Sequence, residues 1–333
     1  MGLRVISTGS YLPVKTVTND DLAAIVETND EWIASRTGIR SRHMANGETT
    51  WYMGLMAAKT AVDRAGIDPA DIGMIIGTTI TSDFITPSMS AVIQSMIGAE
   101  NAFAYDISAA CTGFVYAMDI AEKYLSVRRD MKYVLIISAE KLSEVTNFND
   151  RSSCILFGDG AGAAVVSYSD SLFSSWNGTD AAGFRSIYAK HTRTLSPFED
   201  ESPHIPDDGI DPGTPENVIV QDGKAVYRFA TKALPNAVGK ALEGTGLTPA
   251  DIDIFVPHQA NARIIETAAK HMGVPIEKFH IVLDHVGNTS SSSVPIALDD
   301  AVTAGKIKPG MKMCFVGFGA GLTSGAIIMQ NAE

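Results

Sequence analysis

One short stretch of the sequence, Asp106 to Phe114, carries the residue best suited to nucleophilic chemistry, Cys111. An apolar run from Phe103 to Ile107 predicts a strand before it, and the apolar spacing from Phe114 to Leu125 predicts a buried helix after it. A thiol at the start of a helix meets unpaired N–H groups and the positive end of the helix dipole, which both favour the thiolate. The sequence therefore makes Cys111 a candidate nucleophile with a lowered pKa, the alternative being a small buried side chain.

Two segments later in the chain carry polar residues at similar strand-to-helix transitions. His258 follows a predicted strand over residues 254–257, at the carboxyl end where α/β folds place their sites. Asn288 lies in a turn of small residues after a predicted strand from Phe279 to Leu283. Taken separately, His258 is equally explained as a buried structural histidine and Asn288 as a helix cap. Together with Cys111 they form a candidate catalytic set.

The two halves of the chain resemble each other. GIDPADI at residues 66–72 returns as GLTPADI at residues 246–252, each after an alanine-rich predicted helix, and the glycine segment at 158–162 corresponds to that at 317–321. We expect Asn288 to take the position of Cys111 in this repeat. Such repetition predicts two α/β halves with mostly parallel, buried sheets. We divide the chain into a nucleophile-bearing half (1–170), a connecting region (171–217) and a His/Asn-bearing half (218–333).

Composition excludes several classes of protein. The net charge of −12 argues against nucleic acid as a general partner. Three cysteines give no disulfide framework and favour a cytoplasmic location. No apolar run approaches ~18 residues, so no membrane insertion is expected. The glycines at 158–162 run into a β-branched stretch rather than a helix, so they do not predict a dinucleotide site.

Two further stretches have open interpretations. Residues 195–217 hold seven acidic residues and five prolines without lysine or arginine, which is typical of a solvated surface insertion, with a lid over a site as the alternative. Near the N-terminus, Trp32, Arg36 and Arg40 recur at helical spacing. These three form either a structural stripe, which the spacing alone favours, or a surface that stacks a base and pairs with phosphates.

Several motifs together resemble 3-oxoacyl-acyl-carrier-protein synthase III, the thiolase-fold condensing enzymes that start fatty-acid synthesis. The resemblance covers nearly the whole chain and rests, beside the Cys111 segment, on TNDEWIASRTGIR (28–40), DRSSCILFGDGAGAAVV (150–166), VPHQANARII (256–265), HVGNTSSSSVPIAL (285–298) and GFGAGLTSG (317–325). It implies a thiolase-like fold, with two duplicated α/β halves in a five-layer αβαβα arrangement. The sequence departs from the family in its longer acidic insertion and in Ser324, where many relatives have an aromatic residue.

The resemblance also implies roles for individual residues. Cys111 is the acyl-accepting nucleophile, His258 and Asn288 are its partners, and the N–H groups of Cys111 and Ala320 form the oxyanion hole. The implied coenzyme A contacts are Thr28, Trp32, Arg36, Arg151 and Asn261, which replaces the structural interpretation of Trp32 and Arg36. Thr86 stands where many relatives have a bulky aromatic residue that reaches across the homodimer and closes the end of the acyl pocket. The acyl carrier protein docks on Arg228, Arg263 and Lys270.

The implied reaction has two stages. An acyl-CoA acylates Cys111, and a decarboxylative condensation with malonyl-acyl carrier protein then gives 3-oxoacyl-acyl carrier protein. Coenzyme A enters as a thioester substrate, and neither a metal nor a separate cofactor is expected. The alternatives are an acyl-transferring or condensing enzyme of a secondary-metabolite pathway, and a thioesterase-like hydrolase that uses the same cysteine. A non-catalytic partner subunit ranks last because such subunits lack the nucleophile.

Overall fold

Two sheets form the framework of the protein. The computed structural model describes residues 2–192, 196–198 and 208–332. The first sheet has five strands in the order β1 (Gly2–Tyr11), β7 (Gly160–Ser169), β6 (Tyr133–Glu140), β4 (Ile72–Thr78) and β5 (Phe103–Ile107). The second has four in the order β8 (Phe173–Thr179), β13 (Thr323–Gln330), β12 (Lys312–Gly319) and β11 (Ile254–Pro257).

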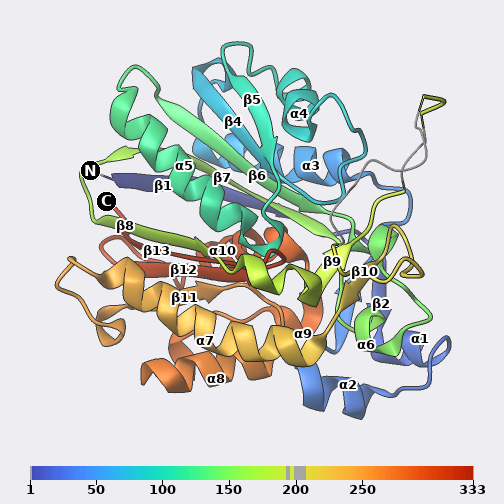
Figure 1. Cartoon of the computed structure of the whole chain (residues 1–333). Helices are drawn as coiled ribbons and strands as arrows, with labels where there is room; N and C mark the ends of the chain where they lie inside the picture. The colour runs from blue at the N-terminus through green and yellow to red at the C-terminus, as the bar shows by residue number, and fades with distance from the viewer. Residues whose placement is uncertain (1, 193–195, 199–207, 333) are drawn as a thin grey trace.

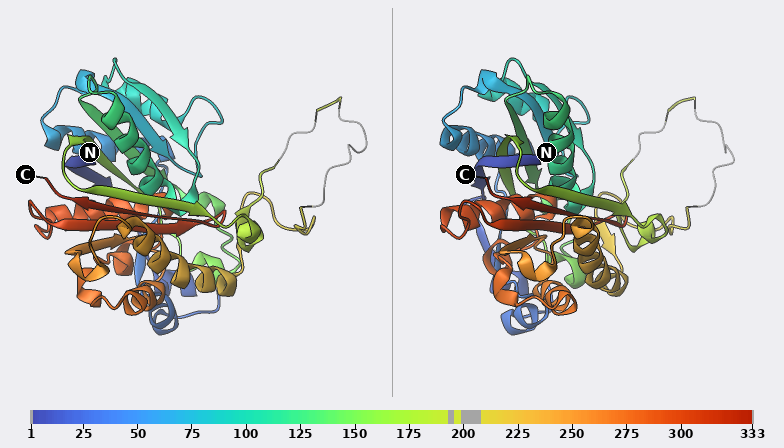
Figure 2. Two further views of the ribbon diagram at one scale, coloured as in Figure 1. Left: turned by 60° about the vertical axis from the view of Figure 1, so that its left-hand side comes forward. Right: turned by 90° about the vertical axis from the view of Figure 1, so that its left-hand side faces the viewer.

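Helices cover both faces of each sheet. The inner layer consists of α5 (Gly113–Val127) and α10 (Ser293–Thr303), which touch both sheets. Outside the first sheet lie α3 (Thr50–Ala65) and α4 (Met89–Ile97), and outside the second lie α7 (Gly223–Leu242) and α8 (Ala262–Met272). Figure 1 shows the second sheet between α10 above and α7 and α8 below, and the turned views of Figure 2 keep this order. The predicted five-layer αβαβα fold is confirmed.

The inner layer is the centre of the core. Phe114, Val115, Met118, Ala121 and Leu125 of α5 are all fully buried, because this helix is apolar on the faces that meet both sheets. One further hydrophobic cluster lies between the first sheet and its outer helices, and another lies between the second sheet and its outer helices. The predicted strand before Cys111 and the buried helix after it are therefore confirmed.

The duplication extends to the order and direction of the strands. In both sheets two antiparallel pairings precede a parallel one, so that β1, β7, β6 and β4 match β8, β13, β12 and β11. The predicted mostly parallel sheets are therefore wrong, because β7 and β13 each run antiparallel to both of their neighbours. The match places β8 in the second half, although our division by sequence assigned residues 171–217 to a connecting region. The predicted strand from Phe279 to Leu283 is wrong. A single bridge joins Phe279 to Phe255, and the chain then forms the short helix α9 (Leu283–Val286).

The structure also corrects the register of the repeat. Before α5 the chain makes the 3-10 turn η2 (Ala110–Thr112), and before α10 it makes the equivalent turn η7 (Ser290–Ser292). The first residue of each turn has a positive φ, 45° at Ala110 and 51° at Ser290. Cys111 therefore corresponds to Ser291, whereas Asn288 stands three positions earlier.

Short elements lie at or near the edge of the sheets that holds the site. They are β2 (Thr16–Thr18), α1 (Asn19–Ala23), α2 (Asp30–Thr37), β3 (Ser41–His43), η3 (Leu142–Val145), α6 (Arg151–Cys154), η4 (Ala181–Ser186), β9 (Ile187–Ala189) and β10 (Ile219–Gln221). The turns η1 (Pro69–Asp71) and η5 (Pro249–Asp251) precede strands β4 and β11 at the opposite edge, and η6 (Ile276–Lys278) contacts η5 there. Asn29 caps α2 by accepting a hydrogen bond from the N–H of Trp32, and the helix ends at Gly38. Arg40 lies beyond that end and pairs with Asp30 at 2.8 Å, so it is not part of the predicted stripe.

Within the described ranges, no helix is long and apolar enough to span a membrane. Of the predicted acidic insertion, residue 195 and residues 199–207 lie outside the described ranges.

A close approach at Gly162 joins the inner layer to the first sheet and gives a test of the packing. A Cβ atom at this position would lie 2.8 Å from the backbone of Pro295 and Ile296 in α10. Because that backbone is buried and cannot yield, we expect Gly162→Val to destabilise folding by about 1–3 kcal/mol. Chemical denaturation monitored by circular dichroism measures this.

The matched control is Gly239→Ala in α7, where an added Cβ meets no atom within 4 Å. This change should be neutral or stabilise by up to about 1 kcal/mol. Equal stability of Gly162→Val and the unchanged protein would contradict the packing described here.

Candidate active site

One cavity gathers the predicted catalytic residues from both halves. It has a volume of about 320 Å³ and is lined by Cys111 from the first half and by His258, Asn288, Phe318 and Ala320 from the second. Its wall is largely apolar elsewhere, with Leu156 and Phe157 among the lining residues. The arrangement therefore encloses a few polar groups in an apolar hollow, as small-molecule sites do.

Cys111 is held in the turn between β5 and α5. Its thiol donates a hydrogen bond to Ser290 Oγ at 3.4 Å. The backbone of β12 passes so close that a Cβ at Gly319 would lie 2.7 Å from the Cys111 nitrogen, which makes glycine necessary there. Burial raises the pKa of the Cys111 thiol to about 12, outweighing the hydrogen bonds from Ser290 and from its own N–H, which lower it. The predicted lowered pKa is therefore wrong for the free protein, whose thiol is protonated.

His258 is buried and neutral. The backbone N–H of His258 donates to the Val316 carbonyl at 2.8 Å, which fixes the residue at the end of β11. The imidazole ring packs edge-on against Phe318. Burial lowers the pKa of its imidazole to about 3. Because this pKa lies far below neutrality, His258 serves as a hydrogen-bonding group without charge.

Ser293 is the hydrogen-bond partner of the His258 ring. Its Oγ lies 2.7 Å from His258 Nδ1 and accepts the N–H of Gln259 at 3.2 Å. This contact is compatible with either tautomer of the imidazole, because a hydroxyl can accept two hydrogen bonds and donate one. When the Ser293 hydroxyl donates to Nδ1, the imidazole proton resides on Nε2, and His258 then offers an N–H donor.

Asn288 is fixed so that its amide also offers a donor. The backbone N–H of Asn288 donates to the Leu156 carbonyl at 2.9 Å, and the backbone carbonyl of Asn288 accepts from the N–H of Gly158 at 3.0 Å. Its side-chain Oδ1 accepts the N–H of Ser290 at 2.9 Å. The Nδ2 group is then left to donate into the cavity.

The predicted coenzyme A residues meet at the mouth of the cavity. Trp32 lies between two guanidinium groups, with Arg36 at 5.0 Å and Arg151 at 4.8 Å from the ring centroid. Trp32, Arg36 and Asn261 line the cavity itself, and Asn261 Nδ2 donates to the Arg36 carbonyl at 3.1 Å. Thr28 has a buried hydroxyl that lacks a hydrogen-bond partner among the described residues. An aromatic ring with two cations suits a base carrying phosphates.

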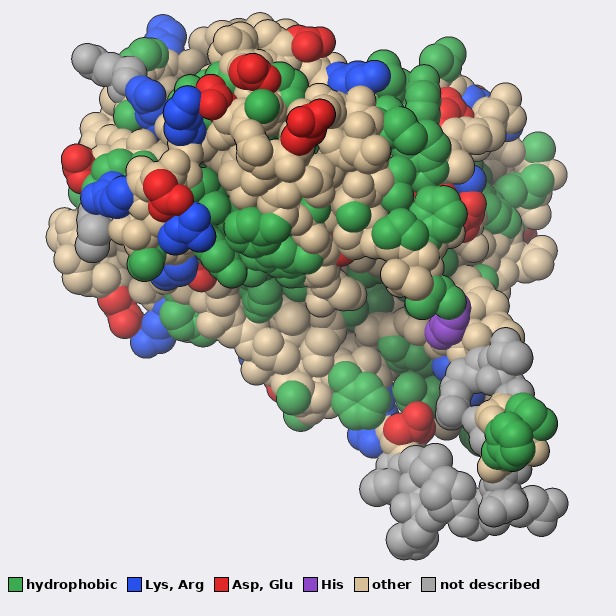
Figure 3. Space-filling view, turned by 90° about the horizontal axis from the view of Figure 1, so that it is seen from above, with side chains coloured by type: hydrophobic (Ala, Val, Ile, Leu, Met, Phe, Trp, Pro, Cys, Tyr) green, Lys and Arg blue, Asp and Glu red, His purple; other side chains and the backbone are tan. Residues whose placement is uncertain are grey.

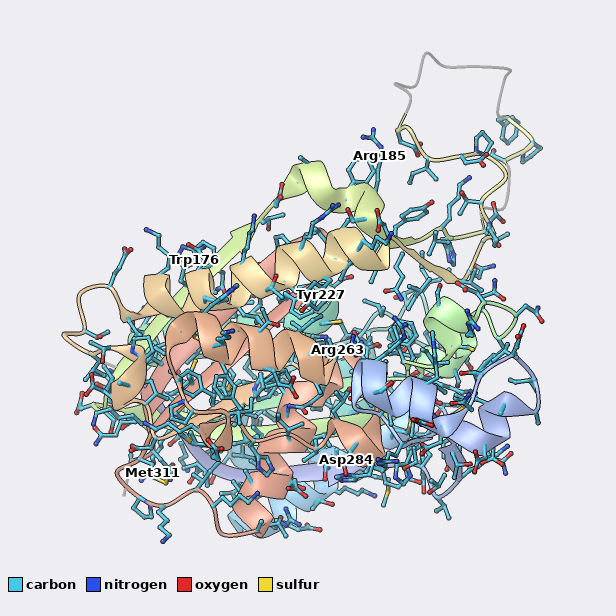
Figure 4. All side chains as sticks on the ribbon, turned by 90° about the horizontal axis from the view of Figure 1, so that it is seen from below. Trp176, Arg185, Tyr227, Arg263, Asp284 and Met311 are labelled. Carbon is cyan, nitrogen blue, oxygen red and sulfur yellow. The ribbon has the colours of Figure 1, made fainter. Side chains whose placement is uncertain are left out.

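Four predicted residues lie on the surface, outside this cavity. Thr86 is exposed in the loop before α4. Arg228 on α7 is exposed, as are Arg263 and Lys270 on α8. Figure 4 shows Arg263 at the start of α8, beside the α2 region and below Tyr227 of α7. The single chain therefore brings the catalytic residues together but not Thr86.

Three buried groups around the catalytic residues were not predicted from the sequence: Ser290, which contacts Cys111 and Asn288, Ser293, which contacts His258, and Glu140, which accepts a hydrogen bond from Ser291. The signal for two of them was the run of four serines at 290–293, all buried at 2 % exposure or less. Within the described ranges, no group of three or more histidine, cysteine, aspartate or glutamate residues is arranged to hold a metal ion.

Fold and site together define a thiolase-fold condensing enzyme: a duplicated αβαβα framework with a cysteine from one half facing a histidine and an asparagine from the other. Two family models match the chain. The model described as 3-oxoacyl-[acyl-carrier-protein] synthase III matches residues 105–181, and the model of the C-terminal part of the same enzyme matches residues 242–331. The chain belongs to this family of acyltransferases.

Three relatives illustrate the match. The beta-ketoacyl-[acyl-carrier-protein] synthase III of Clostridium acetobutylicum is 40% identical over 330 residues, covering 98% of each chain. The solved structure of 3-oxoacyl-[acyl-carrier-protein] synthase III from Aquifex aeolicus is 37% identical with a TM-score of 0.89, covering 99% of this chain and 100% of that one. The priming beta-ketosynthase of the R1128 polyketide biosynthetic pathway is 36% identical with a TM-score of 0.86, covering 99% and 97%.

The role of Ser293 yields a prediction for the reaction. Ser293→Ala removes the hydroxyl that donates to His258 Nδ1 in the Nε2–H form of the ring, so that form loses its support. We expect malonyl decarboxylation to slow on the order of tenfold, a barrier change of about 1.4 kcal/mol, with acylation by acyl-CoA little changed. Release of labelled carbon dioxide and transfer of labelled acyl groups measure the two steps.

The neighbouring Ser292→Ala is the matched control, because the Ser292 hydroxyl is buried without a hydrogen-bond partner among the described residues. A similar loss in Ser292→Ala and Ser293→Ala would show that the turn, and not the histidine proton, is responsible.

Proposed function

We propose that this protein catalyses the first condensation of an acyl chain, by transferring an acyl group from coenzyme A to Cys111 and then to malonyl-acyl carrier protein. The observation that carries the proposal is the meeting of Cys111, His258 and Asn288 in one apolar cavity below the Trp32–Arg36 surface. The product is a 3-oxoacyl-acyl carrier protein, the starting compound of fatty-acid synthesis.

In the first half-reaction Cys111 attacks the thioester carbonyl. Negative charge develops on the carbonyl oxygen, and the N–H groups of Cys111 and Ala320 are the proposed donors to it. Gly319 supports this assignment, because its close contact brings the backbone before Ala320 against that of Cys111. Coenzyme A then leaves through the mouth of the cavity.

In the second half-reaction the malonyl group loses carbon dioxide and becomes an enolate. The enolate oxygen requires hydrogen-bond donors, and the Nε2–H of His258 and the Nδ2 group of Asn288 are the proposed pair. A neutral histidine suits this step, since it donates without surrendering a proton. The enolate carbon attacks the acyl group on Cys111 and releases the sulfur.

The proposed carrier-protein surface is a local basic face on a chain of net charge −12. Arg263 and Lys270 are seven residues apart on α8 and so share one side of that helix, and Arg228 is exposed on neighbouring α7. Such a face attracts an acidic carrier protein and raises the rate of association.

The proposed homodimer involves the edge of the first sheet. Among the residues that the structure describes, strand β5 pairs only with β4, which leaves its outer edge for a second copy. Large apolar side chains are exposed nearby, among them Phe84, Ile85, Met96 and Phe103, and Figure 3 shows hydrophobic side chains gathered on this face. Pairing through β5 buries this surface and brings Thr86 toward the partner's site.

The three unpaired cysteines favour the cytoplasm as the location of the protein.

Two alternatives share the nucleophile. A secondary-metabolite role is favoured by the similarity to the R1128 priming ketosynthase. A thioesterase-like hydrolase requires water at the acyl group, and the apolar lining of the cavity argues against it.

The division of labour between the residues gives the main test. Cys111→Ala should abolish acyl-enzyme formation, because no other group in the cavity is a thiol. His258→Ala and Asn288→Ala should still form the acyl-enzyme but lose decarboxylation and condensation by roughly 10²-fold or more, as removal of one oxyanion donor does. Acyl transfer and carbon dioxide release are measured separately for each variant. Loss of acylation in Asn288→Ala, with decarboxylation retained, would reverse this assignment.

Chain length gives a further prediction. A second hollow of about 660 Å³ shares Ile80, Ala110, Ala189 and Ala320 with the first. Together with the small Thr86, this space should accept medium or longer acyl-CoA in addition to acetyl-CoA. Each methylene group that becomes buried in it should stabilise binding by about 0.8 kcal/mol.

Mass measurement of the acyl-enzyme with a panel of acyl-CoA lengths tests this. Thr86→Phe should shorten the preferred chain. Adducts formed only from acetyl-CoA by the unchanged protein would contradict the prediction.

A further inference from the structure

One charged side chain of the first half, Arg42 on β3, lies inside the protein and has no part in the steps above. It is fully buried, at 0 % exposure. Burial lowers the pKa of its guanidinium to about 10, so the group stays charged at neutral pH. Among the described residues, no aspartate or glutamate forms an ion pair with Arg42, and its Nε atom has no hydrogen-bond partner.

Packing alone does not account for this guanidinium. Taking a charge out of water is unfavourable unless hydrogen bonds and an opposite charge compensate for the lost hydration. An apolar side chain of similar length would fill the same volume without that cost. The use of the charged group therefore has to be sought in the atoms that it holds.

The guanidinium joins two separate parts of the chain. Its Nη1 donates to Asn19 Oδ1 at 2.9 Å, at the start of α1. Its Nη2 donates to the Ile155 carbonyl at 2.8 Å, directly after α6 and 113 positions away in the sequence. Because the guanidinium is a planar and rigid fork, these two bonds fix the position of Ile155 relative to Asn19.

Ile155 leads directly into the segment that holds Asn288. The next carbonyl, that of Leu156, accepts the backbone N–H of Asn288 at 2.9 Å, and the N–H of Gly158 donates to the Asn288 carbonyl at 3.0 Å. We call these two backbone hydrogen bonds the Asn288 frame. Arg42 thus holds the carbonyl immediately before the frame.

The aliphatic stem of Arg42 packs against both segments of the Asn288 frame. A Cβ atom added at Gly158 or at Gly287 would lie 3.0 Å from the Arg42 Cβ, so the backbone of each glycine lies against this stem. Gly287 directly precedes Asn288 and has a φ of 72°, which favours glycine. One side chain therefore contacts each of the two segments that meet at Asn288.

We propose that Arg42 is a positioning residue for malonyl decarboxylation, holding the Asn288 frame so that the Asn288 Nδ2 group is directed into the cavity. The inference rests on the proposed function, in which Asn288 donates to the enolate oxygen. Arg42 does not line the cavity, so it acts through Asn288 and touches no substrate. A hydrogen bond weakens steeply as its angle departs from linear, so a small rotation of the amide slows this step without unfolding the protein.

The first test is Arg42→Met, which keeps an apolar stem and removes the guanidinium. Carbon dioxide release from malonyl-acyl carrier protein should slow by about tenfold, since a misplaced donor loses part of the roughly 10²-fold that its removal costs. Acyl transfer from acyl-CoA to Cys111 should stay within about twofold, because that step does not use Asn288. The matched control is Arg40→Met on the surface, where Arg40 pairs with Asp30, and both steps should be unchanged.

A double-mutant cycle separates positioning from general damage. In the Asn288→Ala background no amide is left to direct, so Arg42→Met should slow carbon dioxide release further by no more than about twofold. The same tenfold loss in both backgrounds would overturn the proposal, and so would an equal loss of the two half-reactions in Arg42→Met alone. Where Arg42→Met fails to fold, Arg42→Lys decides by the same criteria, because a single ammonium keeps the charge but lacks the two ends of the fork.

The side-chain amide resonance of Asn288 gives a readout that does not depend on activity. It is observed in protein labelled with isotope-enriched asparagine and is assigned by its absence in Asn288→Ala. The resonance should shift in the Arg42 variant and keep its position in Arg40→Met, and an unchanged resonance in a folded Arg42 variant overturns the proposal. If the unchanged protein releases no carbon dioxide from malonyl-acyl carrier protein, the proposed function fails, and this resonance still decides whether Arg42 positions Asn288.

Discussion

The close contact between the turn that carries Cys111 and the second half of the molecule is the constraint on which the site depends. The Cys111 backbone lies against β12 at Gly319, and its thiol lies against Ser290 of η7. Both contacts exist because the inner helices α5 and α10 are buried between the two sheets and begin side by side. The duplicated fold therefore does more than repeat a framework, since it brings one turn from each half to the same point.

The same burial determines the electrostatics. Desolvation raises the pKa of Cys111 to about 12 and lowers that of His258 to about 3, so the free protein holds a protonated thiol and a neutral imidazole. The site is therefore nearly free of charge before substrate arrives, apart from the buried carboxyl of Glu140. Hydrogen-bond donors in such a site stabilise a developing oxyanion more strongly than they would in water.

The local elements around Cys111 could be predicted from the sequence. The strand agrees with the structure at Phe103–Ile107, and the helix expected from Phe114 to Leu125 lies within α5, because their apolar periodicity is local. The expected helical stripe ended early because Gly38 stops α2 before Arg40. The strand expected from Phe279 to Leu283 is reduced to one bridge at Phe279, because Phe279, Val282 and Leu283 pack into three different clusters instead of alternating along a sheet.

The groups that position the site could not be predicted, since they depend on contacts between distant parts of the chain. Glu140 meets Ser291 across 151 positions, and Ser293 meets His258 across 35. The helix start at Cys111 indicated a thiolate, but the sequence does not reveal how strongly the surrounding protein removes water from this half-buried thiol. Thr86 stays a prediction because its proposed site belongs to a second copy.

The most direct measurement follows the mass of the Cys111 peptide through both half-reactions. The account predicts that acyl-CoA adds one acyl group to Cys111, that the adduct persists in buffer, and that malonyl-acyl carrier protein removes it with one carbon dioxide released per adduct. An adduct on another residue, or one lost to water as quickly without malonyl-acyl carrier protein as with it, would contradict the account.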